Sequence, residues 1–81
     1  NPIDSEFFTI KIFAGKKYKI RNGDIAGSFV KDCNVAFENL AKIDILEFDT
    51  FVAFRHSELN KIKNLGGKIK IKGKMFNFVI F

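Results

Sequence analysis

Positive charge is concentrated in one short segment of this chain. The stretch Ala14–Arg21 contains no acid and carries four of the chain's fourteen basic residues: Lys16, Lys17, Lys19 and Arg21. Ammonium and guanidinium groups on a connection between rigid elements are well placed to contact the phosphates of a polyanion. Tyr18, in the middle of the stretch, adds a ring on which a nucleobase could stack. The segment therefore predicts a nucleic-acid contact.

A second basic run covers residues 61–74 and also contains no acid. Its six cations are Lys61, Lys63, Lys68, Lys70, Lys72 and Lys74. One interpretation is a solvated helix face and an edge strand whose lysines discourage pairing between molecules. The other is phosphate binding, which we favour because ten of the fourteen cations fall in the two basic segments.

Catalytic and metal chemistry lack the residues that they need. His56 is the single histidine and has no Ser or Cys motif beside it, and one His with one Cys cannot form an ordinary zinc site. Gly66-Gly67-Lys68 lacks the spacing of a phosphate-binding loop. We therefore predict no catalytic residue, no metal and no cofactor in this domain. Cys33 is either a reactive thiol or, as we favour, an inert and partly buried one.

Size and charge restrict the class of protein and partner. Eighty-one residues are enough for one domain, which we place at residues 7–81, after the end of a linker at residues 1–6. A net charge of +5 and a pI near 9.5 favour an acidic partner: nucleic acid, an anionic membrane or an acidic protein. The lone cysteine excludes an internal disulfide and favours a reducing compartment, here the cytoplasm. No apolar run is long enough to span a membrane, and no membrane partner is expected.

The hydrophobic pattern predicts a mixed fold. Period-two alternation predicts strands over residues 8–13, 42–47, 50–55 and 75–81. Helical spacing predicts helices over 23–32 and 57–66, with a single helical turn over 37–41. Lys68–Lys72 alternates Lys with Ile before a turn and is not counted among the strands. The order β-α-β-β-α-β predicts an α+β, ferredoxin-like or RRM-like sandwich, in which two helices cover one face of a four-stranded antiparallel sheet. Gly27, inside the first helix, suggests a close backbone contact.

The sheet face opposite the helices would be open to a ligand. Alternation places on it Thr9, Lys11, Phe13, Phe51, Ala53, Arg55, Asn77 and Val79. Rings beside cations on an open sheet stack single-stranded bases in RNA-recognition motifs. Two alternatives are that a loop or neighbouring domain covers Phe13 and Phe51, or that this face pairs with another protein. The stretch Glu47–Phe54 ends in the Phe-Val-x-Phe of the third-strand RNA-recognition signature but lacks its basic residue, its Gly and one aromatic.

Three segments together are similar to one known family. Gly15–Gly27 resembles the pattern G-K-K-x-K-I-R-x-G-D-(I/V)-x-G. Ala41–Ile45 with Thr50–Phe54 resembles I-G-K-I-x-I…S-Y-V-x-V, and Leu65–Lys74 resembles G-G-K-I-K-G-K. These patterns belong to the C-terminal RNA-binding domain of DbpA-type DEAD-box RNA helicases, and the resemblance covers residues 8–81. The chain departs from them by two extra residues, Ile-Lys, in the last motif, and by Asn77 and Val79 where members have Arg.

The resemblance implies an RRM-like domain attached to a two-domain helicase core that uses ATP and Mg. In the best-known members the domain tethers that core to a hairpin of large-subunit ribosomal RNA during ribosome assembly. We therefore expect a non-catalytic module that binds RNA, specifically structured rRNA. The predicted RNA-binding residues are Lys11, Phe13, Lys16, Lys17, Tyr18, Lys19, Arg21, Phe51, Arg55, Lys70, Lys72 and Lys74. The alternative is a protein-interaction or dimerisation module that uses the open sheet face.

Overall fold

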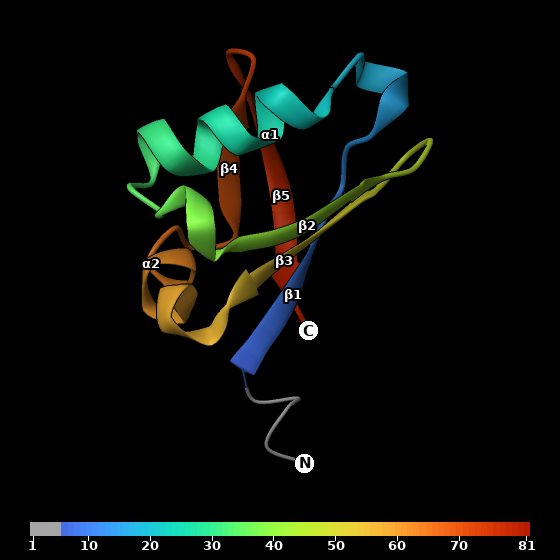
Figure 1. Ribbon diagram of the computed structural model, residues 1–81. Coiled ribbons are helices and arrows are strands. Elements are labelled where there is room, and N and C mark those ends of the chain that lie inside the picture. Colours follow the sequence, from blue (N-terminus) through green and yellow to red (C-terminus); the bar gives the residue numbers. More distant parts are fainter. Residues whose placement is uncertain (1–5) are drawn as a thin grey trace.

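The expected strands and helices appear in the computed structural model of the chain, which describes residues 6–81 (Figure 1). The elements, in chain order, are β1 (Phe7–Ile12), η2 (Lys16–Tyr18), α1 (Asn22–Gly27), η3 (Ser28–Asp32), η4 (Phe37–Asn39), β2 (Leu40–Ile45), β3 (Thr50–Arg55), η5 (His56–Glu58), α2 (Leu59–Lys63), β4 (Lys68–Ile71) and β5 (Lys74–Ile80). Each predicted strand is present within two residues of its expected bounds. The predicted linker end at residues 1–6 lies outside the described residues except for Glu6.

Within residues 6–81, five strands form one antiparallel sheet in the order β2-β3-β1-β5-β4. The α+β class is confirmed, and β1 pairs with β3. The prediction of four strands is wrong, because Lys68–Ile71 pairs with β5 as an edge strand. Lys72 and Gly73 both have positive φ, as a two-residue hairpin turn requires, and this turn brings Ile71 opposite Lys74.

The first predicted helix is a continuous helical segment in two parts. The α-helix α1 passes at Gly27 into the π-helical segment η3, which ends at Asp32. The helix begins after Arg21, whose backbone N–H donates to Asp24 Oδ2 at 3.0 Å, so Asp24 provides a side-chain cap. The close contact expected at Gly27 is absent: no atom in the described part of the chain would lie within 4 Å of a Cβ there. The second helix ends at Lys63, three residues before the predicted end, and Gly66 beyond it has the expected left-handed conformation, with φ +69°.

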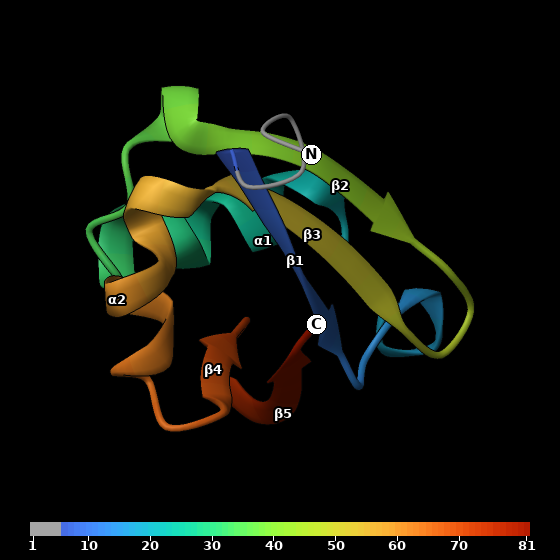
Figure 2. The ribbon, with the colours of Figure 1, turned by 90° about the horizontal axis from the view of Figure 1, so that it is seen from below.

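Helices cover one face of the sheet and leave the other open (Figures 1 and 2). On β1 the core side chains are Phe8, Ile10 and Ile12, which alternate with partly or largely exposed residues. Phe54 of β3 packs edge-to-face on Phe29 of η3, with ring centroids 4.9 Å apart. The helices thus bury the apolar stripe that the alternation predicted, and the predicted open-face residues are at least partly accessible.

Candidate nucleic-acid interface

The basic turn, residues 15–21, packs against the hairpin between β2 and β3. The backbone N–H groups of Lys16 and Lys17 donate to the carbonyl oxygens of Leu46 and Glu47 at 2.9 and 3.0 Å. Gly15 lies so close to this hairpin that a Cβ would collide with the carbonyl oxygen of Leu46. Figure 1 shows the blue turn beside the hairpin tip. A backbone contact rather than a side chain therefore positions the cations.

A buried hydroxyl secures the start of the basic turn. Thr50, the first residue of β3, donates from Oγ1 to the carbonyl oxygen of Ala14 at 2.7 Å, and both residues are buried. Because Ala14 directly precedes Gly15, this bond connects the turn to a central strand of the sheet. The cations of the turn are exposed on a backbone that the sheet holds in place.

The two basic segments meet in space. Lys72, in the β4–β5 turn, donates from Nζ to the carbonyl oxygen of Lys19 at 3.1 Å. Both residues have left-handed backbone conformations, with φ of 52° and 61°, which are uncommon for lysine. The contact joins positions 53 residues apart in the sequence.

A groove of about 680 Å³ lies where these segments meet. Its charged lining consists of four cations and one acid: Lys16, Lys19, Arg21, Lys72 and Asp24. Asp24 is half-buried and already accepts the backbone N–H of Arg21, whereas the four cations are exposed. The groove can therefore bind several phosphates with little competition from its own carboxylate.

A smaller hollow of about 190 Å³ continues from this groove past Lys72 and Lys74. Tyr18 lines it and packs edge-to-face on Phe76 of β5, with ring centroids 5.2 Å apart. Tyr18 thus lies beside the cation-lined groove. Lys17 is directed elsewhere, with its Nζ 5.4 Å from the ring centre of Phe48 at the hairpin tip.

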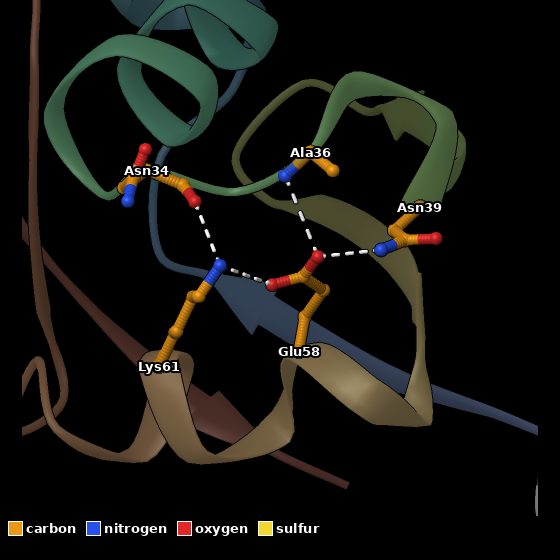
Figure 3. Close-up of polar contacts among 5 residues, drawn as sticks. All are labelled: Asn34, Ala36, Asn39, Glu58 and Lys61. Carbon is orange, nitrogen blue, oxygen red and sulfur yellow. Dashed lines mark hydrogen bonds and ion pairs between the residues drawn. The ribbon is translucent and has the colours of Figure 1, made fainter.

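The second basic run is not one cluster. Lys61 of α2 forms an ion pair with the buried Glu58 at 3.2 Å and donates to the carbonyl oxygen of Asn34 at 2.8 Å (Figure 3). Both ribbon views place α2 and the basic turn at opposite ends of the molecule. Lys70 lies on β4 opposite Met75, outside the groove lining. Of the six lysines, the fold therefore brings Lys72 and Lys74 to the basic turn.

Glu58 accepts hydrogen bonds from two further residues besides its ion pair with Lys61 (Figure 3). Its Oε2 accepts the side-chain amide of Asn39 at 2.6 Å and the backbone N–H of Ala36 at 3.4 Å. The bond from Asn39 is the largest cause of a lowered pKa for Glu58, helped by Lys61 and Ala36 and opposed by burial. This network of hydrogen bonds connects α2 to the segment between η3 and β2. Lys61 is therefore engaged in contacts that hold the fold together.

The predicted sheet-face residues lie on the open face, and none of them lines the basic groove. Lys11 Nζ is 5.4 Å from the ring centre of Phe13, which is 45% exposed. Phe51 is partly covered because it stacks on Phe81, with centroids 5.9 Å apart. Arg55 pairs with Phe7 at the end of β3 that is farther from the basic turn, and six strand residues span about 20 Å.

Comparison with known proteins identifies the family. Residues 9–79 match the family model of the DbpA RNA-binding domain. The chain belongs to the DbpA RNA-binding domain family. It is 36% identical over 73 residues to the ATP-dependent RNA helicase DbpA of Escherichia coli strain K12. That alignment covers 89% of this chain and 16% of the bacterial protein, so the chain spans a small part of its relative.

As a DbpA RNA-binding domain, the chain belongs to a family of RNA-binding rather than catalytic domains. Burial, and secondarily the charge of Asp32, raises the pKa of the Cys33 thiol, which disfavours the reactive thiolate. Among residues 6–81, no three His, Cys, Asp or Glu side chains are grouped to hold a metal, and no helix has the length and hydropathy to cross a membrane.

Sequence reasoning missed several residues of this DbpA RNA-binding domain that lie beside the predicted ones. Phe48, Phe76 and Phe81 contact Lys17, Tyr18 and Phe51 respectively. The alternation along β5 predicted the face of Phe76 but not its neighbour, because a neighbour depends on strand register. Phe48 lies in the hairpin between β2 and β3, where no alternation applies. Lys42 and Asp44 were also missed, and they line a hollow of about 260 Å³ on the open face with Thr9, Phe51 and Ala53.

Proposed function

We propose that this DbpA RNA-binding domain holds structured RNA mainly by its phosphates, in the groove lined by Lys16, Lys19, Arg21 and Lys72. The observation that carries the proposal is the meeting of two distant basic segments, joined by the bond from Lys72 to Lys19. Phosphate contacts supply affinity and orientation without reading bases. The groove therefore suits a tether that recognises a shaped RNA.

We also propose that the domain works as part of a longer, cytoplasmic DEAD-box helicase and tethers its core to RNA. Support comes from the name of the E. coli relative, an ATP-dependent RNA helicase, and from the sequence resemblance described above. In this proposal ATP and Mg belong to the attached core, which would be the enzyme. The RNA would be a structured segment of ribosomal RNA, bound during assembly of the large subunit.

The groove is tested by its salt dependence. Fluorescence anisotropy with a labelled RNA hairpin measures the affinity of this chain over a range of KCl concentrations. Four neutralised phosphates predict a log–log slope of about −3, since each phosphate contributes about −0.7 to −0.9. The triple variant Lys16→Ala/Lys19→Ala/Arg21→Ala should lose about two units of that slope and bind roughly 100-fold more weakly at low salt.

A charge-matched control separates the groove from net charge. The triple variant Lys31→Ala/Lys63→Ala/Lys68→Ala removes the same charge from exposed positions that do not line the groove. It should retain nearly the full slope, because exposed charges beyond about 10 Å are screened at 0.1 M salt. Equal losses in the two variants would mean that the groove has no special role.

The open sheet face supports a second candidate function, protein interaction or dimerisation. Phe13, Val79 and Phe81 are apolar and exposed there, and Phe81 is 69% accessible. Sedimentation equilibrium of the chain distinguishes the two functions. RNA binding predicts a monomer whose affinity for RNA does not change with protein concentration. A stable dimer that dissociates in a Val79→Asp/Phe81→Asp variant would favour the interaction module.

A further inference from the structure

A hollow of about 360 Å³ lies between α1 and β2, next to the phosphate groove. Asn22 lines both cavities, so the two are neighbours at this residue. Leu40, Lys42 and Ile43 of β2 line the hollow, and so does Phe37 of η4. The hollow thus combines a largely apolar lining with a position next to the cations of the groove.

Phe37 differs from the other exposed aromatic residues of the described chain. Phe7, Phe13 and Phe48 each have a cation near the ring, and Tyr18 and Phe81 each pack on another ring. Within residues 6–81, Phe37 has neither kind of partner although its side chain is 68% exposed. An exposed, unpartnered ring that lines a hollow is available to stack on a ligand.

Small residues keep the hollow open. Gly23 and Ala26 of α1 and Ala41 of β2 line it, and none extends beyond a methyl group. A Cβ added at Gly23 would meet no atom of the described chain within 4 Å. The side-chain amide of Asn22, at the junction with the groove, has both hydrogen-bond donors and an acceptor for the polar edge of a planar group.

We propose that an unpaired nucleobase of the bound RNA enters this hollow and stacks on Phe37, while the neighbouring phosphates lie in the groove of Lys16, Lys19 and Arg21. The inference rests on the proposed function, since it needs RNA in that groove. Aromatic stacking tolerates any base, and removal of the ring weakens binding by about 5- to 100-fold per base. The hollow therefore selects RNA with an unpaired nucleotide next to a helix.

The test compares a blunt RNA duplex with the same duplex carrying a short single-stranded extension that contains 2-aminopurine. For the wild-type chain, the extended RNA should bind more tightly, and its 2-aminopurine fluorescence should be quenched at saturation. Phe37→Ala should abolish the quenching and weaken binding of the extended RNA at least 5-fold, while binding of the blunt duplex and the salt slope stay unchanged. Phe37→Tyr should restore both signals.

Two further variants make the outcome decisive. Ala26→Leu leaves the ring in place but fills the hollow, and it should also remove the quenching. Phe48→Ala removes another exposed ring, which lies outside the hollow, and should leave the 2-aminopurine quenching intact. The proposal is overturned if the 2-aminopurine fluorescence is quenched by Phe37→Ala as strongly as by the wild type. It is also overturned if Phe37→Ala lowers the affinity for the blunt and the extended RNA equally. The salt slope of the groove variants tests phosphate binding in the groove, and the quenching tests base stacking on Phe37. Failure of the proposed function and failure of this inference are therefore distinguishable.

Discussion

Lys72 and Lys61 provide a direct test of which lysines of the second basic run bind RNA. Both donate to a backbone carbonyl oxygen, Lys72 to Lys19 and Lys61 to Asn34. Only Lys72 lines the phosphate groove, and its ammonium group has three donors, of which the bond to Lys19 uses one. We therefore expect Lys72→Ala to weaken RNA binding and Lys61→Ala to leave it unchanged.

The magnitude follows from counterion release. One phosphate contact contributes about 0.7 to 0.9 to the salt slope. If the variant and the wild type bind equally at 1 M salt, loss of the contact lowers the variant's affinity by about 5- to 8-fold at 0.1 M salt. This corresponds to about 1 kcal/mol at 0.1 M salt. Lys61 lies beyond the far end of β3, whose length of about 20 Å exceeds the screening length of about 10 Å. The electrostatic attraction between Lys61 and RNA in the groove should therefore be negligible.

The assay is a salt titration of hairpin affinity for the wild type and both variants. Far-UV circular dichroism and urea unfolding of each variant show whether the fold is retained, which matters for Lys61→Ala because Glu58 loses its ion pair. The reasoning is refuted if Lys72→Ala keeps the full wild-type slope. It is equally refuted if Lys61→Ala, still folded, loses as much slope as Lys72→Ala.

Two further perturbations test the scaffold. Gly15→Ala should reduce stability by about 1–3 kcal/mol and loosen the basic turn, because the new methyl group meets the hairpin backbone. Gly27→Ala, whose new methyl group meets no atom of the described chain within 4 Å outside its own helix, should be neutral or stabilising by up to about 1 kcal/mol. Urea unfolding measures the stability of both variants, and equal effects would exclude the proposed collision at Gly15. Glu58 has a folded-state pKa below its ordinary value of 4.5, so its stabilisation is present above that pH and is lost as the pH falls through the folded pKa. Glu58→Gln should therefore be less stable than the wild type at pH 7, by about 1–2 kcal/mol, and the gap should narrow in acid; a constant gap between pH 7 and pH 3 would contradict this.

Local sequence determined most of the secondary structure. Alternation with period two is a property of neighbouring residues, so strands such as Thr50–Arg55 could be predicted with their buried and exposed sides. Lys68–Ile71 has the same alternation, but a four-residue strand is stable only through its partner, which local sequence does not reveal. The hairpin turn at Lys72 and Gly73 brings that partner, β5, alongside it.

The candidate site divides in the same way. The sequence by itself determined that Lys16, Lys19 and Arg21 lie together, since they are close along the chain, and that their segment belongs to the DbpA family pattern. Only the tertiary structure decided which distant lysine joins them. Lys72 reaches Lys19 through the pairing of β4 with β5, whereas Lys61, equally basic in sequence, is held by Glu58. Charge is carried by each residue, but a binding groove depends on distances that long-range packing sets.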